Sequence, residues 1–434
     1  MREMRNSGVD WIGEIPATWE IVPLKSLFSF GKGLPITKDN LEETGVPVIS
    51  YGQIHAKWNS GVTVHRELLR FVNKSYLDTN PQSLVHRGDF TMADTSEDRE
   101  GCGNCAYVDT DELLFAGYHT IILRSLSKTD NKYLAYLFLT DPWRSQMRKA
   151  VSGVKLFSIS RRILGSVSVI VPDNADEIVV HLDKKCTQVN SLIENVRTQI
   201  EKLKAYKQSL ITEVVTKGLD PSVPMKDSGV EWIGEIPAHW EITRIKNKFV
   251  LRNERNDEAD LAKVNLISLY TDLGVVQHSD LTATTGNRAV TAEGYKIVHK
   301  NDIVVNIILC WMGAVGMSKY EGVTSPAYDI YRPLEGTNSE YFHYLFRTNR
   351  FNGECYRYGR GIMMMRWRTY STEFSAINIP CPPEDEQQQI VAYLEEKCDQ
   401  VDRLIAIKQA KIEKLEQYKR TLIYEYVTGK KEVS

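Results

Sequence analysis

The sequence lacks the features that mark a secreted or membrane-spanning protein. No apolar run approaches the roughly 18 residues that a membrane span needs, and the N-terminal segment MREMRNSGVDWIGEIP contains no apolar signal-peptide core. The 7 cysteines are an odd number with scattered spacing, which argues against a disulfide framework. We therefore expect a cytosolic (cytoplasmic) protein with reduced thiols.

Motifs of nucleotide-dependent enzymes are also missing. The sequence has no G-x-x-x-x-G-K-[ST] motif for ATP, and no glycine-rich strand–turn motif for S-adenosylmethionine stands out. Asn80-Pro81 continues as Gln-Ser, so the Asn-Pro-Pro-aromatic motif of DNA amino-methyltransferases is absent. We find no convincing carboxylate–lysine cluster of a nuclease. The chain is therefore expected to bind rather than to catalyse, with no catalytic residue of its own.

One cysteine pair has metal-ligand spacing, Cys102-Gly-Asn-Cys105. A structural zinc site needs four ligands, but there is no second C-x-x-C, and the nearest candidate, His119, has no partner at zinc-finger spacing. We expect no metal site and no cofactor in this chain.

Basic and acidic residues are nearly balanced in number. The chain has 434 residues with 54 Lys and Arg against 56 Asp and Glu, and 42% of its residues are hydrophobic. This composition is typical of globular proteins, and the length leads us to expect two to four domains. The net charge of -2 by itself disfavours a nucleic-acid partner, so the local distribution of charge must decide.

The sequence contains an internal duplication. SGVDWIGEIPATWE (7–20) returns as SGVEWIGEIPAHWE (228–241), an offset of 221 residues. VHRGDF (85–90) matches VHKNDI (298–303), and KYLAYLFLT (132–140) matches EYFHYLFRT (340–348). Residues 179–216 match residues 391–428 at an offset of 212. The pattern is a duplication with matched ends and divergent middles, and its long period excludes a solenoid.

The matched C-terminal segments carry heptad repeats that predict two long helices. Cys186 and Cys398 fall in the apolar series as small fillers, whereas Lys207, Lys408 and Lys419 interrupt it. Because a long apolar seam must be covered, the two helices are expected to pair antiparallel; the alternative is that each packs only on its own domain. The predicted seam consists of Leu182, Val189, Ile193, Val196, Ile200, Leu203, Leu210, Leu394, Val401, Ile405, Ile412, Leu415 and Leu422.

The segments before the helices mix short β-rich runs with loops. VPVIS (46–50), TIILR (120–124), VNLISLY (264–270) and DIVVNIIL (302–309) read as strands, and the two YL-containing segments as short helices. The prediction is an α/β chain with an internal two-fold repeat. We place domain 1 at 1–173, helix 1 at 174–217, a linker at 218–228, domain 2 at 229–383, helix 2 at 384–427 and a tail at 428–434.

A basic stretch follows each short helix. Residues 144–162 hold six basic residues and no acid, and residues 347–368 hold six arginines and one acid, with aromatic residues interleaved. Arginine suits both phosphate contact and bidentate contact with guanine; the alternative is a solvated charged face. The candidate DNA-binding residues are Arg144, Arg148, Lys149, Lys155, Arg161, Arg162, Arg347, Arg350, Arg357, Arg360, Arg366, Trp367 and Arg368.

The paired SGVxWIGEIPxxWE openings, the helices ending Tyr-Lys-x-x-Leu-Ile-x-Glu-x-Val-Thr and the Pro-Pro-Glu-Asp-Glu-Gln-Gln run (382–388) resemble the specificity subunits of type I restriction–modification systems. The first copy departs from this pattern at Pro172-Asp-Asn-Ala-Asp-Glu-Ile, which makes the N-terminal cap of its helix uncertain.

The resemblance implies two target-recognition domains alternating with two antiparallel helices that set the distance between half-sites. It implies a non-catalytic subunit that recognises a bipartite double-stranded DNA target. The implied partners are two modification (methyltransferase) subunits and further restriction (translocase and nuclease) subunits, which carry S-adenosylmethionine, ATP and Mg. The competing interpretations are a single-chain restriction enzyme or methyltransferase and a coiled-coil scaffold without a DNA role.

Overall fold

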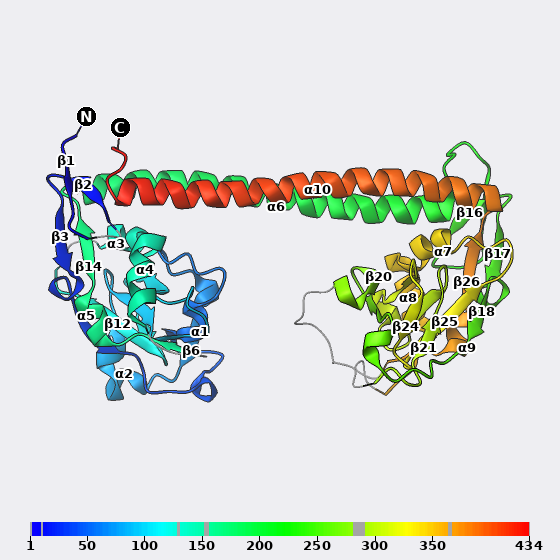
Figure 1. The fold of residues 1–434 in the computed structure, drawn as a ribbon, viewed down its shortest axis with the longest axis horizontal. Coiled ribbons are helices and arrows are strands. Elements are labelled where there is room, and N and C mark those ends of the chain that lie inside the picture. The colour runs from blue at the N-terminus through cyan, green and yellow to red at the C-terminus, as the bar shows by residue number, and fades with distance from the viewer. Residues whose placement is uncertain are drawn as a thin grey trace. The chain divides into compact units, whose positions relative to one another are not determined.

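A computed structural model describes residues 2–9, 12–127, 131–151, 156–280, 291–362 and 367–433. The chain divides into two compact units (Figure 1). Unit 1 comprises residues 1–196 and 410–434, and unit 2 comprises residues 197–409. The division passes through both long helices, so each unit contains a globular part and a segment of each helix. The finer domain boundaries given above stay a prediction.

Unit 1 contains one sheet in the order β10-β8-β12-β4 and a second in the order β6-β5-β11-β7. The strands are β1 (Met4–Asn6), β2 (Glu14–Pro16), β3 (Glu20–Pro23), β4 (Phe28–Lys32), β5 (Val46–Ile49), β6 (Arg70–Val72), β7 (Leu84–Val85), β8 (Phe90–Ala93), β9 (Thr95–Ser96), β10 (Cys105–Tyr107), β11 (Leu114–Ala116), β12 (Thr120–Ser125), β13 (Phe157–Ser158) and β14 (Ser168–Val171). The short helices are α1 (Tyr51–Ile54), α2 (Tyr76–Thr79), α3 (Lys132–Phe138), α4 (Asp141–Ala150) and α5 (Arg161–Ser166).

Unit 2 repeats the first sheet as β23-β22-β25-β18, but two-stranded pairs, β19-β20 and β21-β24, stand in place of the second sheet. The strands are β15 (Met225–Asp227), β16 (Glu235–Pro237), β17 (Glu241–Arg244), β18 (Phe249–Arg252), β19 (Ile267–Tyr270), β20 (Gly274–Gln277), β21 (Lys296–Val298), β22 (Ile303–Asn306), β23 (Val315–Met317), β24 (Gly322–Thr324), β25 (Tyr328–Pro333) and β26 (Asn378–Cys381). The short helices are α7 (Ser339–Phe346), α8 (Asn349–Tyr358) and α9 (Ser371–Ala376).

The long helices are α6 (Ala175–Lys217) and α10 (Glu384–Val427), of 43 and 44 residues. At 1.5 Å per residue each is about 65 Å long. Both helices have acidic residues in their first turns, where the positive end of the helix dipole stabilises negative charge. Each helix ends at a glycine with positive φ, Gly218 (76°) and Gly429 (68°), the left-handed conformation that commonly terminates helices. In the register of the repeat α6 begins three residues later than α10, where the first copy departs from the Pro-Pro-x-x-Glu-Gln pattern.

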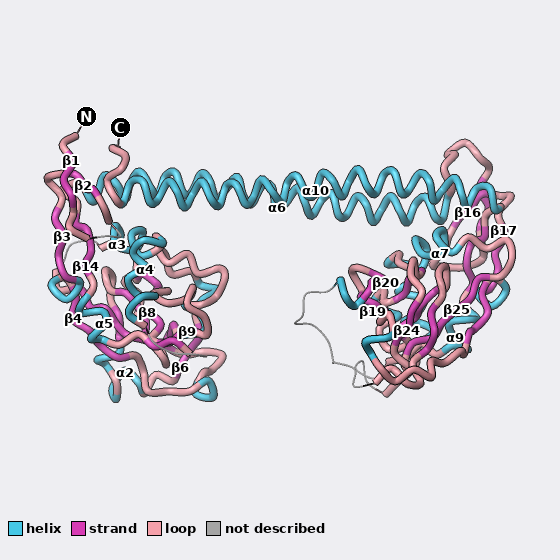
Figure 2. The backbone as a smooth tube through the Cα atoms, viewed as in Figure 1, coloured by secondary structure: helices cyan, strands magenta, loops and turns pink. Residues whose placement is uncertain are grey.

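The predicted antiparallel pairing of the helices is confirmed (Figure 2). In unit 1 the start of α6 packs beside the end of α10, because Leu182 and Leu422 share one core cluster. In unit 2 the end of α6 packs beside the start of α10, where Val214 and Leu394 share another. The predicted seam residues are buried at Leu182, Val189, Ile193, Val196, Ile200, Leu394, Val401, Ile412 and Leu422, and half-buried at Leu203, Leu210, Ile405 and Leu415.

The three lysines that interrupt the heptads each reach a polar group on the other helix. Lys207 Nζ lies 2.6 Å from the Asp402 carboxylate. Lys408 Nζ donates to Gln199 Oε1 at 2.6 Å, and in unit 1 Lys419 Nζ donates to Asn190 Oδ1 at 2.8 Å. The polar breaks in the seam are therefore satisfied across the helix pair, as a partly buried charge requires.

A tyrosine docks the globular part of each unit onto the end of a long helix. Tyr133 on α3 donates its hydroxyl to the Val427 carbonyl at 2.6 Å. Its counterpart Tyr341 on α7 donates to the Val215 carbonyl at 2.8 Å. Both carbonyls belong to the last helical turn, whose groups have no partner within the helix. Among the described residues, no helix is long and apolar enough to cross a membrane.

Candidate nucleic-acid interface

The first basic stretch folds into α4, β13 and the start of α5 in unit 1. Trp143 and Met147 are fully buried and anchor α4 to the core. Arg144 donates its Nε–H to the Phe138 carbonyl at 3.0 Å, and burial lowers its pKa. Its guanidinium is therefore used within the unit, and we leave Arg144 out of the proposed DNA contacts.

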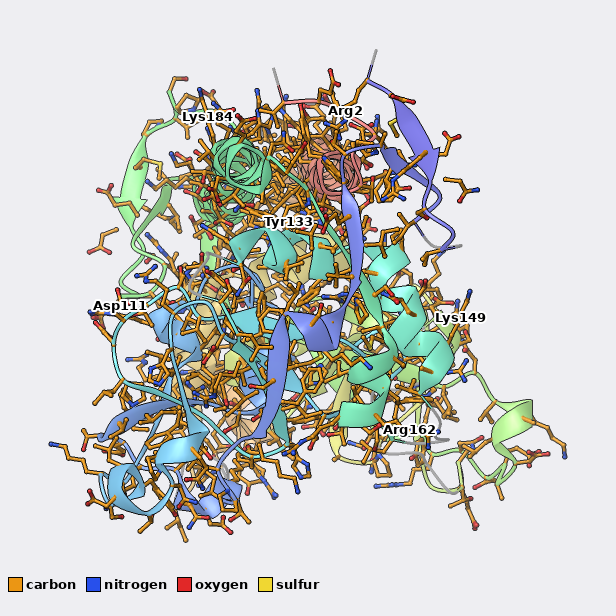
Figure 3. The ribbon with its side chains drawn as sticks, turned by 90° about the vertical axis from the view of Figure 1, so that its left-hand side faces the viewer. Arg2, Asp111, Tyr133, Lys149, Arg162 and Lys184 are labelled. Carbon is orange, nitrogen blue, oxygen red and sulfur yellow. The ribbon has the colours of Figure 1, made fainter. Side chains whose placement is uncertain are left out.

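The remaining cations of this stretch differ in their partners. Arg148 lies between two carboxylates, Glu100 at 2.9 Å and Asp141 at 3.1 Å. Lys149, Arg161 and Arg162 are exposed and pair with no acid among the described residues. Figure 3 shows Lys149 and Arg162 on the same side of unit 1, with Asp111 on the opposite side. Predicted Lys155 lies outside the described residues. The positive surface of unit 1 is therefore smaller than the sequence count indicates.

The second basic stretch folds into α8 and the segments that follow it in unit 2. Arg347 donates to the backbone carbonyls of Asp272 at 2.7 Å and Val315 at 3.3 Å, and burial lowers its pKa. It fixes the β19–β20 turn to the end of α7, so we also leave Arg347 out of the proposed contacts.

Two further arginines of unit 2 pair with carboxylates of their own unit. Arg357 contacts the Glu354 carboxylate at 2.9 Å, and Arg360 forms an ion pair with Glu373. Exposed Arg350 and Arg368 have no acidic partner in the part of the chain that the structure describes. Predicted Trp367 stacks on Tyr356 with ring centroids 5.0 Å apart, and predicted Arg366 lies outside the described residues.

The two basic stretches occupy equivalent backbone positions. The Ile159 N–H donates to the Asp94 carbonyl at 2.7 Å, and the Thr369 N–H donates to the Ile307 carbonyl at 2.9 Å. These bonds hold each stretch to the loop that follows β8 or its counterpart β22. In this register Phe157 corresponds to Trp367, and in the register of the two helices Arg148 on α4 corresponds to Tyr356 on α8. The backbone is therefore repeated while the side chains at these half-buried or exposed positions differ.

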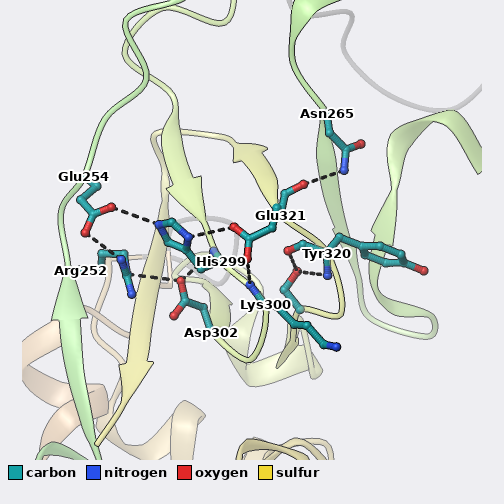
Figure 4. Close-up of polar contacts among 9 residues, drawn as sticks. Arg252, Glu254, Asn265, His299, Lys300, Asp302, Tyr320 and Glu321 are labelled. Atoms are coloured by element: carbon teal, nitrogen blue, oxygen red, sulfur yellow. Dashed lines mark hydrogen bonds and ion pairs between the residues drawn. The ribbon is translucent and has the colours of Figure 1, made fainter.

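The repeated His-x-x-Asp segment, which the sequence marks only as a match, is a turn rather than a site. Asp302 Oδ2 accepts the His299 N–H at 2.9 Å and lies 3.4 Å from Arg252. In unit 2 the His299 ring also lies between the Glu254 and Glu321 carboxylates, at 3.2 and 2.8 Å (Figure 4).

The counterpart in unit 1 has Asp89 Oδ2 accepting the His86 N–H at 3.0 Å. Gly88 and Asn301, at matching places in the two turns, both have positive φ, a conformation that glycine and asparagine tolerate. The motif recurs because both copies need this turn before an inner strand.

The cysteine pair of unit 1 lies in the core. Cys102 and Cys105 are buried, and burial raises the pKa of the Cys105 thiol to about 12. Because zinc binds the thiolate, this environment disfavours a metal. In the described part of the chain, no three histidine, cysteine or carboxylate side chains are arranged to hold a metal ion.

The sequence matches the family described as type I restriction modification DNA specificity domain over residues 16–202 and 239–417. The chain belongs to this family. The match occurs twice, once in each copy of the repeat, and covers most of the chain. The predicted class, a specificity subunit with two target-recognition domains rather than a catalytic subunit, is confirmed.

The individual relatives are distant, and they cover between about half and nearly all of this chain. The MjaX specificity subunit of a type I restriction enzyme from Methanocaldococcus jannaschii is 24% identical over 96% of this chain and 95% of its own length. The MjaVIII specificity subunit from the same organism is 23% identical over 47% of each chain. One solved structure comes from work on the complex assembly and conformational transition of the type I R-M system. It has a TM-score of 0.67 at 15% identity, and the match covers 95% of this chain and 98% of that one. The structural likeness supports the fold.

Proposed function

We propose that the basic surface of each unit contacts one half of a bipartite DNA target. The observation that carries this proposal is that the two basic stretches share a backbone arrangement but carry different side chains on it. A surface that held two identical partners would keep its side chains, whereas surfaces that read different sequences would change them on a common frame. The cations without an acidic partner among the described residues are Lys149, Arg161 and Arg162 in unit 1 and Arg350 and Arg368 in unit 2. Of these, Arg350 also donates to the Ile233 carbonyl at 3.4 Å.

These cations suit two kinds of DNA contact. A guanidinium binds phosphate or makes a bidentate contact with guanine, whereas an ammonium acts mainly as a point charge on phosphate. Arg148, Arg357 and Arg360 are partly neutralised by carboxylates. We therefore assign them mainly to positioning, and the cations without an acidic partner to binding.

The proposed partners follow from the family. We propose that the chain joins two modification subunits, which methylate adenine with S-adenosylmethionine, and restriction subunits that use ATP and Mg. The chain itself supplies no cofactor site, and the complex acts in the cytoplasm. The relatives are named as subunits of type I restriction enzymes, which supports this assignment of partners.

The test uses the chain assembled with its modification subunits and methylation-site sequencing of the DNA. Alanine at both Arg161 and Arg162 is expected to weaken or relax one half-site. Alanine at both Arg350 and Arg368 is expected to affect the other half-site. A lost base contact should weaken recognition by about 1–3 kcal/mol at one position, and a lost phosphate contact should reduce the salt dependence of binding for all sequences.

Lys74→Ala is the matched control, because Lys74 is an exposed cation of unit 1 outside the basic stretch. If both double variants kept the wild-type affinity, salt dependence and methylation pattern, the stretches would be solvated charged faces. Methylation of DNA by the isolated chain with labelled S-adenosylmethionine would contradict the assignment of that cofactor to the partners.

A further inference from the structure

Each unit has a loop after its inner strand, the β8–β10 loop (94–104) in unit 1 and the β22–β23 loop (307–314) in unit 2. The hydrogen bonds described above tie the first residue of each loop to a basic stretch. Near the other end, Gly103 and Gly313 have positive φ values of 87° and 90°. A Cβ on Gly313 would lie 3.2 Å from Asn352 Nδ2 on α8. The two loops are therefore held at their ends in the same way.

The side chains between these fixed ends differ in chemistry. The β8–β10 loop holds four acidic residues and one arginine, and its exposed residues are 97–100. The β22–β23 loop holds no charged residue. It exposes Leu309 and Met312, whose exposed fractions are 37% and 50%. Since both sequences form a loop between the same anchors, exposed apolar side chains are not needed to build it.

Leu309 and Met312 form an apolar ridge on a fixed turn. The Met312 N–H donates to the Leu309 carbonyl at 2.9 Å, which closes the short helix η8 (Cys310–Met312). Side chains three residues apart in such a turn lie on the same side. Between them, Cys310 points inward and its Sγ lies 3.1 Å from Cys355 Sγ on α8. Large apolar side chains that are exposed together mark a binding surface.

The apolar ridge continues into the basic surface of unit 2. Trp311 donates its indole N–H to the Ile308 carbonyl at 3.0 Å, and its ring packs edge-on against the exposed Tyr356 of α8 at 5.8 Å. The residue that ties the loop to the basic stretch, Thr369, directly follows Arg368, which has no acidic partner among the described residues. Apolar side chains bordered by guanidinium groups complement DNA, where phosphates flank a groove that displays the methyl group of thymine.

We propose that the apolar ridge contacts thymine methyl groups in the half-site that unit 2 contacts, so that this half-site includes A·T base pairs. This inference rests on the proposed function, because it requires that unit 2 bind DNA. Phosphate contacts bind any sequence, whereas the methyl group distinguishes thymine from the other bases in the major groove. The ridge therefore supplies a sequence-dependent contact beside the cations. Unit 1, whose loop is acidic, has no such ridge at this place.

The test uses the full chain assembled with its modification subunits and duplexes that carry the methylation site of the complex. The half-site of unit 2 is the one whose recognition is impaired by alanine at both Arg350 and Arg368. Each thymine of that half-site is replaced in turn by uracil, which lacks only the methyl group. At least one replacement is expected to weaken binding of the wild-type complex about fourfold.

Variants of the ridge show whether it makes this contact. With alanine at both Leu309 and Met312, the same uracil replacement should cause no further loss, because the two changes remove one interaction. Met312→Leu, which keeps an apolar group, should retain the uracil effect. Leu251→Ala is the matched control, because Leu251 is an exposed aliphatic residue on β18, at the other edge of the same sheet. It should retain the full uracil effect, and circular dichroism would verify that each variant is folded.

The outcomes separate the two proposals. If the arginine double variant impairs neither half-site, the proposed function fails, and the methyl contact fails with it. If that variant identifies a half-site but the wild-type complex binds the uracil duplexes as tightly as the thymine duplex, only the methyl contact is overturned. The same holds if the uracil effect persists unchanged in the ridge double variant. If that double variant instead prevents assembly with the modification subunits, as gel filtration would show, the ridge binds a protein and the methyl contact is overturned.

Discussion

The two units agree closely where they meet the long helices and diverge away from them. Tyr133 and Tyr341 make the same hydrogen bond to the last turn of a helix. Strand order is also the same in the sheet beside those helices, β10-β8-β12-β4 and β23-β22-β25-β18. The second sheet of unit 1, however, is reduced to two-stranded pairs in unit 2. The features that hold the helices are therefore repeated, whereas the second sheet differs between the two copies.

Equivalent positions in the two units also differ in their polar contacts and titratable side chains. Trp240 donates its indole N–H to Glu386 at 2.7 Å, but the equivalent Trp19 has a buried indole N–H without a partner among the described residues. His343 of unit 2 stands where unit 1 has Ala135. The two copies thus share a frame but differ in these local interactions, and substitutions at paired positions can measure what each difference contributes to stability.

The largest effect is expected in the helix seam. Leu182 and Leu394 are equivalent and both fully buried, so Leu182→Ala and Leu394→Ala should each destabilise their own unit by about 2–5 kcal/mol. Chemical denaturation monitored by hydrogen exchange would measure both losses of unfolding free energy, because hydrogen exchange reports on the two units separately. The half-buried pair Leu203 and Leu415 is the control and should lose less on the same substitution. Equal losses at all four positions would contradict the burial pattern and the equivalence drawn from it.

Much of this frame was predictable from the sequence, because heptads depend on local spacing. The antiparallel helix pair, the two α/β parts and the stops at Gly218 and Gly429 follow from periodicity and from glycine conformation. The strand predicted over 302–309 proved too long, since β22 ends at Asn306. There Asn306 Oδ1 accepts the Ile308 N–H at 3.0 Å, a side-chain turn that competes with the strand ladder.

The basic surfaces were predictable in position but not in their usable charge. The charge of Arg148 is partly neutralised by Glu100, which lies far from it in the sequence. Arg144 and Arg347 donate hydrogen bonds to backbone carbonyls of their own units. Such pairings depend on how loops pack, and a count along the sequence cannot include them. The stacking of Trp367 on Tyr356 likewise depends on how the chain packs after α8, so the sequence did not indicate it.

A smaller effect is expected from acid in unit 2. His343 Nδ1 accepts the Met317 N–H at 3.1 Å, and burial lowers the pKa of His343 to about 3. The unfolded chain binds a proton near pH 6.5 while the folded unit does not, so stability is lost as pH falls from about 6.5 towards 3. Between pH 7.5 and 5 unit 2 should lose up to about 2 kcal/mol through this residue.

Unit 1 gives the internal control for that prediction, since Ala135 cannot titrate. Hydrogen exchange at the two pH values should show a larger loss in unit 2, and His343→Gln should reduce the difference between the units. An unchanged difference in the variant would show that other groups cause the acid sensitivity.

The smallest effect concerns Trp19 and Trp240, of which only Trp240 donates its indole N–H to a carboxylate at the start of a long helix. Asn174 occupies the position of Glu386 in the repeat, and its Oδ1 is buried without a partner among the described residues. Asn174→Glu should place a carboxylate beside the Trp19 indole N–H and at the N-terminus of α6, where negative charge is favoured. We expect unit 1 to gain about 0.5–1.5 kcal/mol of unfolding free energy, measured by denaturation. In a Trp19→Phe background, which removes the donor, most of the gain should vanish. A gain that persisted in that background would come from the helix dipole alone, and the two units would then differ at their helix starts for a reason other than the missing indole partner.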